Sequence, residues 1–138
     1  MNGGTVVVDA STLVAAVAST GSLGDQARAT LRGHRRAAPH LIDAEVGNAL
    51  RSMVLRGDLT NGVGASARLM AERLVQRRHP IHGAIAARAW QLRHNLSFYD
   101  ALYVALAESL HCQLITADNR IARAFKDYDL ISTITPDD

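Results

Sequence analysis

The sequence has a single cysteine and no long apolar run, and each shortage excludes a class of protein. Cys112 is the single cysteine among 138 residues, so the chain cannot form an internal disulfide. A small chain without disulfides is typical of the cytoplasm. No apolar run approaches the ~20 residues that a membrane-spanning helix needs, and the N-terminus lacks the basic segment and cleavage site of a secretory signal. We therefore expect a cytoplasmic, globular protein.

Several familiar catalytic motifs are also missing. No glycine-rich phosphate loop follows the first apolar run, which argues against a nucleotide-binding Rossmann domain. Ser11 could serve as a nucleophile, but no histidine is placed to activate it. The six histidines show no paired metal-binding spacing on one helix. Cys112 and Trp90 lie among apolar residues, where we expect an inert buried thiol and a core side chain.

The charge of the chain is mildly basic. The formal net charge is +2 and the isoelectric point is about 9.1, which permits RNA binding without requiring it. Fourteen of the fifteen basic residues are arginine, the exception being Lys126. Arginine can bind a phosphate through two hydrogen bonds at once, but a preference for arginine can also reflect the base composition of a genome.

The apolar pattern predicts strands that alternate with helices. Residues 5–9 contain three consecutive valines, as in a parallel strand that is buried on both faces. We predict strands at residues 5–9, 37–39, 113–115 and 129–134, with 79–81 at most a short strand. The predicted helices cover residues 13–18, 25–31, 41–56, 84–93 and 119–125, and two more follow caps at Thr60 and Ser97. Such alternation is typical of an α/β fold with a parallel sheet covered on both faces.

Four acids occupy comparable places in this pattern. Asp9 and Asp118 directly follow apolar strands, and Glu45 and Asp100 lie in the first turns of amphipathic helices. The carboxyl ends of parallel strands share one edge of the sheet, where ligands bind in open α/β folds. The four carboxylates could therefore converge in one pocket, and ligand sets made only of oxygen favour hard cations such as Mg²⁺ or Mn²⁺.

Each acid also has a purely structural interpretation. Asp9 and Asp118 could cap the helices that follow them, although Ser11 or Thr12 could cap the first of these instead. Glu45 and Asp100 could simply interact with the positive ends of their helix dipoles. Caps are common and metal sites are rare, so it is the shared position of the four acids that favours a site.

The chain resembles a known family at four motifs. The segments 9–14 and 116–118, together with Pro39 and residues 45–51, are similar to conserved segments of PIN-domain ribonucleases, specifically of the VapC toxins. The segment 99–107, Tyr-Asp-Ala-Leu-Tyr-Val-Ala-Leu-Ala, resembles the third and most specific motif of that family. The four motifs occur in the family's order and span nearly the whole chain.

This resemblance implies a fold, an activity and a set of partners. The implied fold is a single PIN-like domain over residues 1–138, a three-layer α/β/α sandwich with a central five-stranded parallel sheet. The implied activity is that of a Mg²⁺- or Mn²⁺-dependent endoribonuclease toxin that hydrolyses RNA phosphodiester bonds, in tRNA or rRNA. A cognate VapB-type antitoxin would neutralise it, and the chain would form a homodimer.

The resemblance also assigns roles to particular residues. The implied catalytic and metal-binding acids are Asp9, Glu45, Asp100 and Asp118, with Ser11, Asn48 and Thr116 as supporting residues. Some PIN domains carry a further acid after the fourth, where this chain has Asn119 and Arg120, which argues against a tightly held second metal. A cation is unfavourable at the start of a helix, so Arg120 is a candidate contact for RNA phosphate or for an antitoxin carboxylate, although it could also be a solvated side chain.

Two rival hypotheses remain open from the residues alone. The chain could be a non-catalytic binding module with an acidic pocket, or another Mg²⁺-dependent phosphohydrolase on a similar sheet. RNA cleavage that requires added metal would favour the nuclease over the binding module. Activity on small phosphate monoesters would favour the other phosphohydrolase.

Overall fold

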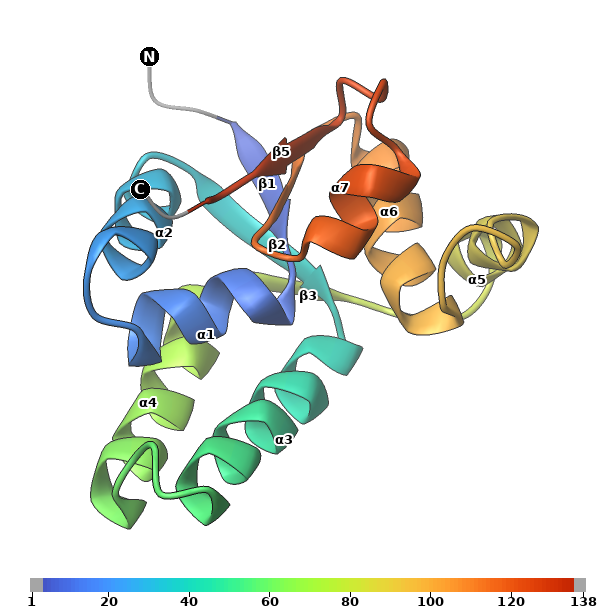
Figure 1. Ribbon diagram of the computed structural model, residues 1–138. Coiled ribbons are helices and arrows are strands. Elements are labelled where there is room, and N and C mark those ends of the chain that lie inside the picture. Colours follow the sequence, from blue (N-terminus) through green and yellow to red (C-terminus); the bar gives the residue numbers. More distant parts are fainter. Residues whose placement is uncertain (1–3, 136–138) are drawn as a thin grey trace.

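The computed structural model describes residues 4–135, which fold around a five-stranded sheet (Figure 1). Neighbouring strands are all parallel, and their order is β3-β2-β1-β4-β5. The strands are β1 Thr5–Val8, β2 Arg35–Pro39, β3 Arg77–His79, β4 Leu114–Thr116 and β5 Ile131–Thr133. The central position of β1 beside β4 brings the residues that directly follow these two strands to the same edge of the sheet.

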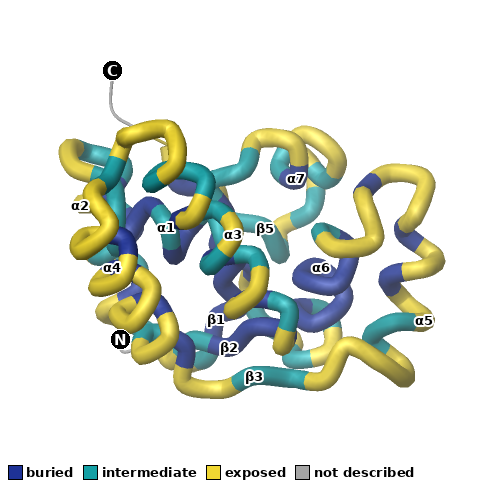
Figure 2. The backbone as a smooth tube through the Cα atoms, turned by 90° about the horizontal axis from the view of Figure 1, so that it is seen from below, coloured by how far each residue is buried: buried dark blue, intermediate teal, exposed yellow. Residues whose placement is uncertain are grey.

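The helices of the described residues flank this sheet. They are α1 Ala10–Ala18, α2 Ser22–Arg32, α3 Leu41–Leu55, α4 Asn61–Leu74, α5 Ala84–Gln91, α6 Phe98–Leu110 and α7 Asn119–Ala124. Figures 1 and 2 show α1, α2 and α4 on one side of the sheet and α5 and α6 on the other. The predicted α/β fold with a five-stranded parallel sheet and helices on both faces is confirmed.

Two predicted boundaries were wrong for identifiable reasons. The first helix begins at Ala10 rather than residue 13, because the Asp9 side chain caps it by accepting a hydrogen bond from the Thr12 N–H. The third strand covers residues 77–79 rather than 79–81. Pro80 has no N–H to offer a neighbouring strand, and the register pairs Arg77 with Ala37. The predicted caps Thr60 and Ser97 are confirmed.

The core packs against both faces of the sheet, and β1 and the middle of α6 are its most buried segments. The three valines of β1 are buried, and so is every residue from 101 to 107 of α6 (Figure 2). α6 is therefore apolar around most of its circumference, which fixes its first turn firmly against the carboxyl edge of the sheet. Among the residues described, none of the helices is long and apolar enough to cross a membrane.

Trp90 does not lie in this core as we predicted. Its side chain is 60% exposed near the end of α5, where Ala89 is the buried position. The Arg93 guanidinium lies 4.8 Å from the centre of the indole ring and covers part of it. Cys112 is half-buried rather than buried as we predicted, and burial raises the pKa of its thiol.

Candidate functional site

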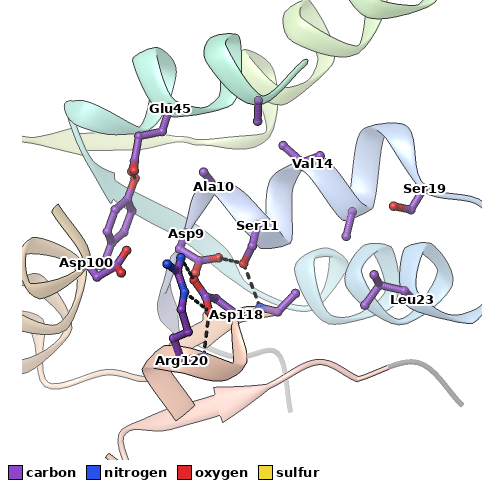
Figure 3. A pocket seen from close by; sticks show the side chains of 14 residues that line it. Asp9, Ala10, Ser11, Val14, Ser19, Leu23, Glu45, Asp100, Asp118 and Arg120 are labelled. Atoms are coloured by element: carbon purple, nitrogen blue, oxygen red, sulfur yellow. Dashed lines mark hydrogen bonds and ion pairs between the residues drawn. The ribbon is translucent and has the colours of Figure 1, made fainter. Parts of the chain in front are cut away.

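A cavity of about 470 Å³ opens at the carboxyl edge of the sheet, beside the starts of α1, α6 and α7 (Figure 3). We call it the acidic cavity. Four acids line it, one from each of four separate segments: Asp9, Glu45, Asp100 and Asp118. The cavity is also lined by Ser11, Tyr103 and Arg120, and by small and apolar side chains of α1 and α3. The structure therefore brings together the four acids that the sequence singled out.

Asp9 is the buried acid of this cavity, with 5% of its surface exposed. Its Oδ1 accepts hydrogen bonds from Ser11 Oγ at 2.7 Å, the Thr12 N–H at 3.0 Å and Thr12 Oγ1 at 3.1 Å. Its Oδ2 accepts one from Thr116 Oγ1 at 2.5 Å. Burial raises the pKa of Asp9, and these hydrogen bonds oppose the rise. The carboxylate is therefore both the cap of α1 and a rigidly oriented hydrogen-bond acceptor that lines the cavity.

The hydroxyls of Ser11 and Thr116 join the two loops that carry Asp9 and Asp118. Ser11 Oγ accepts a hydrogen bond from the Ala117 N–H at 3.0 Å. Thr116 Oγ1 accepts one from the Asp118 N–H at 2.9 Å while it donates to Asp9. These two residues, predicted to support the site, thus fix the relative positions of the first and fourth acids.

Glu45 projects from the first turns of α3 and is held by a residue that the sequence analysis did not single out. The Tyr103 hydroxyl donates a hydrogen bond to Glu45 Oε1 at 2.5 Å. Burial raises the pKa of Glu45, the hydrogen bond from Tyr103 lowers it, and the charges of Asp100 and Asp9 raise it further. Tyr103 stands three residues after Asp100 on α6, and this helical spacing was the available signal that both share one face.

Asp100 lies in the first turn of α6, whose N-cap Ser97 accepts a hydrogen bond from the Asp100 N–H at 3.1 Å. The cap fixes the backbone, and the carboxylate faces the cavity (Figure 3). Burial raises the pKa of Asp100, and the nearby charge of Asp118 raises it further. Arg120 and a hydrogen bond with the Ser97 side chain oppose this rise. Asp9, Glu45 and Asp100 therefore share the raised pKa expected of carboxyls gathered in a partly desolvated pocket.

Asp118 differs from the other three acids because it is paired with a cation. Arg120 Nη2 lies 2.8 Å from Asp118 Oδ2, and the Arg120 N–H donates to Oδ1 at 2.8 Å. The hydrogen bond from Arg120 lowers the pKa of Asp118. The arginine that we considered as a contact for RNA or an antitoxin thus binds an acid of its own chain.

Asn48 is the one predicted supporting residue that lies apart from this arrangement. It is exposed on α3, does not line the acidic cavity, and makes no side-chain hydrogen bond within residues 4–135.

The donor set of the acidic cavity suits a hard cation, but the side chains are not arranged around one. Carboxylate and hydroxyl oxygens are the ligands that Mg²⁺ and Mn²⁺ prefer. Within residues 4–135, however, no three acids, histidines or cysteines are grouped closely enough to hold a metal ion. Tyr103 engages Glu45 and Arg120 engages Asp118. A cation bound among these acids would therefore have to draw at least one carboxylate away from its present partner.

Comparisons with solved structures support the fold. A crystal structure of PAE2754 from Pyrobaculum aerophilum matches with a TM-score of 0.71 at 21% identity, covering 94% of this chain and 89% of that chain. The Mycobacterium tuberculosis protein VapC20, described as a sarcin-ricin loop cleaving toxin, matches at 0.58 and 19% identity over 78% and 85% of the two chains. VapBC2 from Rickettsia felis, solved with a DNA fragment from their promoter, matches at 0.66 and 11% identity over 94% and 98%.

Sequence comparisons identify the family. The model of the PIN domain matches residues 6–126. Ribonuclease VapC1 of Mycobacterium tuberculosis is 43% identical over 118 residues, which cover 86% of this chain and 89% of the relative. Ribonucleases VapC9 and VapC3 of the same species are 43% and 39% identical, over 85% and 87% of this chain and 88% and 87% of theirs. The chain therefore belongs to the PIN-domain family and, within it, to the VapC ribonucleases, the toxins of toxin–antitoxin systems.

Proposed function

We propose that this VapC ribonuclease is an endonuclease that hydrolyses RNA phosphodiester bonds in the acidic cavity with the help of Mg²⁺ or Mn²⁺. The observation that carries the proposal is the meeting of Asp9, Glu45, Asp100 and Asp118, from four segments of the chain, in one cavity of about 470 Å³. We assign all four as ligands for the metal. When bound, the metal would polarise the phosphate and lower the pKa of an attacking water.

The side chains of the acidic cavity would have separate roles in the reaction. Asp9 keeps one orientation because Ser11, Thr12 and Thr116 all donate to it. Burial raises the pKa of Glu45 and of Asp100, so each holds a proton more readily near neutral pH than an ordinary carboxyl does. A divalent cation bound beside them would oppose that rise, so both carboxyls can ionise and act as ligands. Arg120, at the rim of the cavity, can bind the phosphate with its guanidinium.

The direct test is cleavage of tRNA and rRNA by the purified protein with Mg²⁺ or Mn²⁺ and with chelator. We expect cleavage only with metal, and a loss of about 100-fold or more in Asp9→Asn and Asp100→Asn. Asparagine caps a helix as well as aspartate does, so circular dichroism should show an intact fold in Asp9→Asn. The matched control is Asp25→Asn, which removes an exposed acid that does not line the cavity. Cleavage in chelator, or a folded Asp9→Asn that cleaves at the wild-type rate, would contradict the proposal.

We also propose that a VapB-type antitoxin neutralises the enzyme by placing an arginine among the carboxylates. Support comes from the similar fold of VapBC2 from Rickettsia felis, whose name joins a VapB to a VapC. The Arg120–Asp118 pair in this chain shows that a guanidinium fits beside the acids. A co-expressed cognate antitoxin should suppress cleavage, and its arginine-to-alanine variant should suppress it less. If the cognate antitoxin leaves cleavage unchanged, this proposal fails.

We further propose that the protein is a homodimer whose contact includes the outer faces of α3 and α4. Large apolar side chains stand exposed there: Leu55, Val63, Leu69 and Met70. Exposed apolar patches of this kind mark interaction surfaces, and twofold contacts are the commonest way to cover them. A stable monomer in light scattering at micromolar concentration would exclude the dimer. We also propose that residues 1–138 form one PIN domain in each subunit. Given the proposed RNA substrates, we expect the protein to act in the cytoplasm.

A further inference from the structure

We propose that a second cleft, at the opposite end of the sheet from the acidic cavity, binds phosphates of the RNA substrate outside the cleavage site. The cleft has a volume of about 630 Å³ and lies where β1, β2 and β3 begin, beside the last residue of α6, Leu110. We call it the donor cleft. The inference rests on the proposed action on RNA. The polar residues of the donor cleft that would contact phosphate are Arg35, Gln76, Arg77 and His79.

The strand register places the two arginines on one face of the sheet. Ala37 is the register partner of Arg77, and Arg35 lies two residues before Ala37 on the same strand. Side chains two residues apart on a strand point to the same face, and diagonal neighbours of this kind are about 7 Å apart. Both side chains are exposed, and within residues 4–135 neither guanidinium has a hydrogen bond or an ion pair.

Not every arginine beside the donor cleft lacks hydrogen-bond partners, and Arg36 is one that has them. Its guanidinium donates to the carbonyl oxygens of Leu31 and His34, each at 2.7 Å, and also to that of Leu74. Arg36 therefore serves the fold. Its neighbour Arg35 and the adjacent Arg77 are left with all of their donors available.

The other polar groups of the cleft are also donors. Gln76 Oε1 accepts a hydrogen bond from the Arg36 N–H at 2.9 Å. The Gln76 NH₂ group is therefore the part of its side-chain amide that can donate to a ligand in the cleft. His79 Nε2 is buried and has no hydrogen-bond partner. Burial and the charge of Arg77 lower the pKa of His79, which keeps the imidazole neutral and able to donate from Nε2 in one tautomer. None of the described residues that line the cleft is acidic. Two guanidinium groups, an amide and an imidazole together suit a ligand with several anionic oxygens.

The basic residues of β3 have a simpler explanation, which accounts for only part of this arrangement. β3 is an edge strand, and charged side chains on an edge strand prevent sheets from joining edge to edge. That explanation covers Arg77. It does not cover Arg35, which lies on an inner strand, or the buried and unpartnered nitrogen of His79.

The position of the cleft favours RNA over an acidic protein as its ligand. Thr5, at the cleft, stands four residues before Asp9 on β1. At about 3.3 Å per residue the two sites are roughly 13 Å apart along the strand. An RNA held in the acidic cavity carries phosphates on both sides of the cleaved bond, and these can extend over that distance. Because phosphate contacts position a nucleic acid without reading its sequence, the cleft would increase affinity rather than choose the cleavage site.

The test is binding of unfractionated tRNA to the full chain, measured by fluorescence anisotropy in chelator over a series of salt concentrations. We expect Arg35→Gln/Arg77→Gln to bind more weakly and to lower the slope of log affinity against log salt by about 2, one for each lost phosphate contact. The control Arg32→Gln/Arg73→Gln removes the same charge from exposed arginines outside the cleft and should change the slope much less. In cleavage assays with metal, the cleft variant should raise KM for tRNA and leave kcat unchanged.

A second variant separates RNA binding from protection of the sheet edge. Arg35→Lys/Arg77→Lys keeps the charge but loses the two-pronged guanidinium. We expect it to stay monodisperse in light scattering, to keep most of the salt slope, and to bind tRNA several-fold more weakly than wild type. If the glutamine variant aggregates, the lysine variant carries the test. Wild-type tRNA affinity in the lysine variant would then assign the arginines to the edge alone and overturn the proposal.

Other outcomes also decide the question. Wild-type affinity and slope in a soluble Arg35→Gln/Arg77→Gln would overturn the proposal, as would an equal loss in the control. If that variant keeps its tRNA affinity but loses affinity for poly-glutamate, the cleft belongs to an acidic protein instead. Failure of the wild type to cleave any RNA would refute the proposed function, whereas the binding measurements would still report on the cleft.

Discussion

The Arg120 guanidinium binds the Asp118 carboxylate by both of its oxygens, with Nε 3.2 Å from Oδ1 and Nη2 2.8 Å from Oδ2. The arginine side chain is 74% exposed, whereas the acid is only 19% exposed. An exposed cation of the chain itself therefore neutralises one of the four acids proposed to bind metal. A metal ion and Arg120 would compete for the same carboxylate.

The first prediction follows from this competition. Arg120→Gln should bind Mn²⁺ more tightly than wild type, because Asp118 no longer has to leave its partner. Exposed ion pairs contribute at most about 1 kcal/mol, so we expect a decrease in Kd of up to about fivefold, measured by titration calorimetry. Arg123→Gln is the control, since Arg123 lies one turn further along and has no hydrogen bond to Asp118. Weaker Mn²⁺ binding in Arg120→Gln would mean that the arginine orients Asp118 for the metal instead.

The sequence predicted the acids well because their positions follow from local rules. An acid directly after a buried parallel strand must lie at the carboxyl edge of the sheet, so Asp9 and Asp118 could be placed without a structure. From the sequence alone, a helix cap and a ligand of a metal site were alternative roles for Asp9. In the structure one carboxylate caps α1 and also faces the acidic cavity, and these two roles are compatible because its two oxygens have different partners.

The contacts that depend on tertiary packing could not be predicted in the same way. Tyr103 and Glu45 are 58 positions apart, and only the fold, in which α3 and α6 both contact β2, brings them together. Trp90 shows the reverse error, since an apolar helix does not reveal which of its faces meets the core. Asn48 shares a motif with Glu45, but its place on α3 leaves it exposed. The donor cleft could not be predicted either, because Arg35 and Arg77 become neighbours only through the pairing of β2 with β3.

The second prediction concerns the hydroxyl of Tyr103. Tyr103→Phe removes the hydrogen bond to Glu45 with little change in packing, so we expect a loss of about 1 kcal/mol in the free energy of unfolding. The hydrogen bond holds the pKa of Glu45 down, and its loss should move the acid limb of the pH–rate profile to higher pH. Urea unfolding and the rate of RNA cleavage against pH measure the two effects.

Tyr128→Phe is a matched control for this variant. It removes a similar hydrogen bond, from Tyr128 to Glu108 Oε2 at 2.6 Å, that lies outside the acidic cavity. The control should lose similar or less stability and keep the wild-type pH–rate profile. The same profile in both variants would show that Tyr103 supports the fold but not the reaction.

The third prediction concerns Thr116, whose hydroxyl connects two of the acids. Thr116→Val leaves the buried Asp9 Oδ2 without its donor and the Asp118 N–H without its acceptor. Each unsatisfied group costs about 1–3 kcal/mol, so we expect a loss of about 2–4 kcal/mol in guanidinium unfolding. Thr116→Ser keeps the hydroxyl and should lose about 1 kcal/mol, the contribution of one buried methyl group. A loss in Thr116→Ser with no loss in Thr116→Val would show that Thr116 acts through its methyl group alone.

The fourth prediction uses the opposite pKa shifts of Asp100 and Asp118. Burial raises the pKa of Asp100, so the folded protein binds more protons there than the unfolded chain. Stability from this source is present at low pH and is lost as the pH rises through the folded value. At pH 7 without metal, Asp100→Asn should therefore be more stable than wild type. The gain should be at most about 1 kcal/mol, because the carboxyl is only half-buried and water screens it.

Asp118→Asn should change stability in the opposite direction. The hydrogen bond from Arg120 lowers the pKa of Asp118, so its contribution is present at neutral pH and is lost as the pH falls through the folded value. Asparagine preserves the cap of α7, which leaves the lost charge as the main difference. Asp118→Asn should therefore be less stable than wild type at pH 7.

Added Mg²⁺ should stabilise wild type by mass action and Asp100→Asn much less, so the melting temperatures of these two proteins should converge or cross across a Mg²⁺ titration. Equal shifts would exclude Asp100 from a metal site, and a less stable Asp100→Asn in chelator would show that its carboxylate serves mainly to start α6.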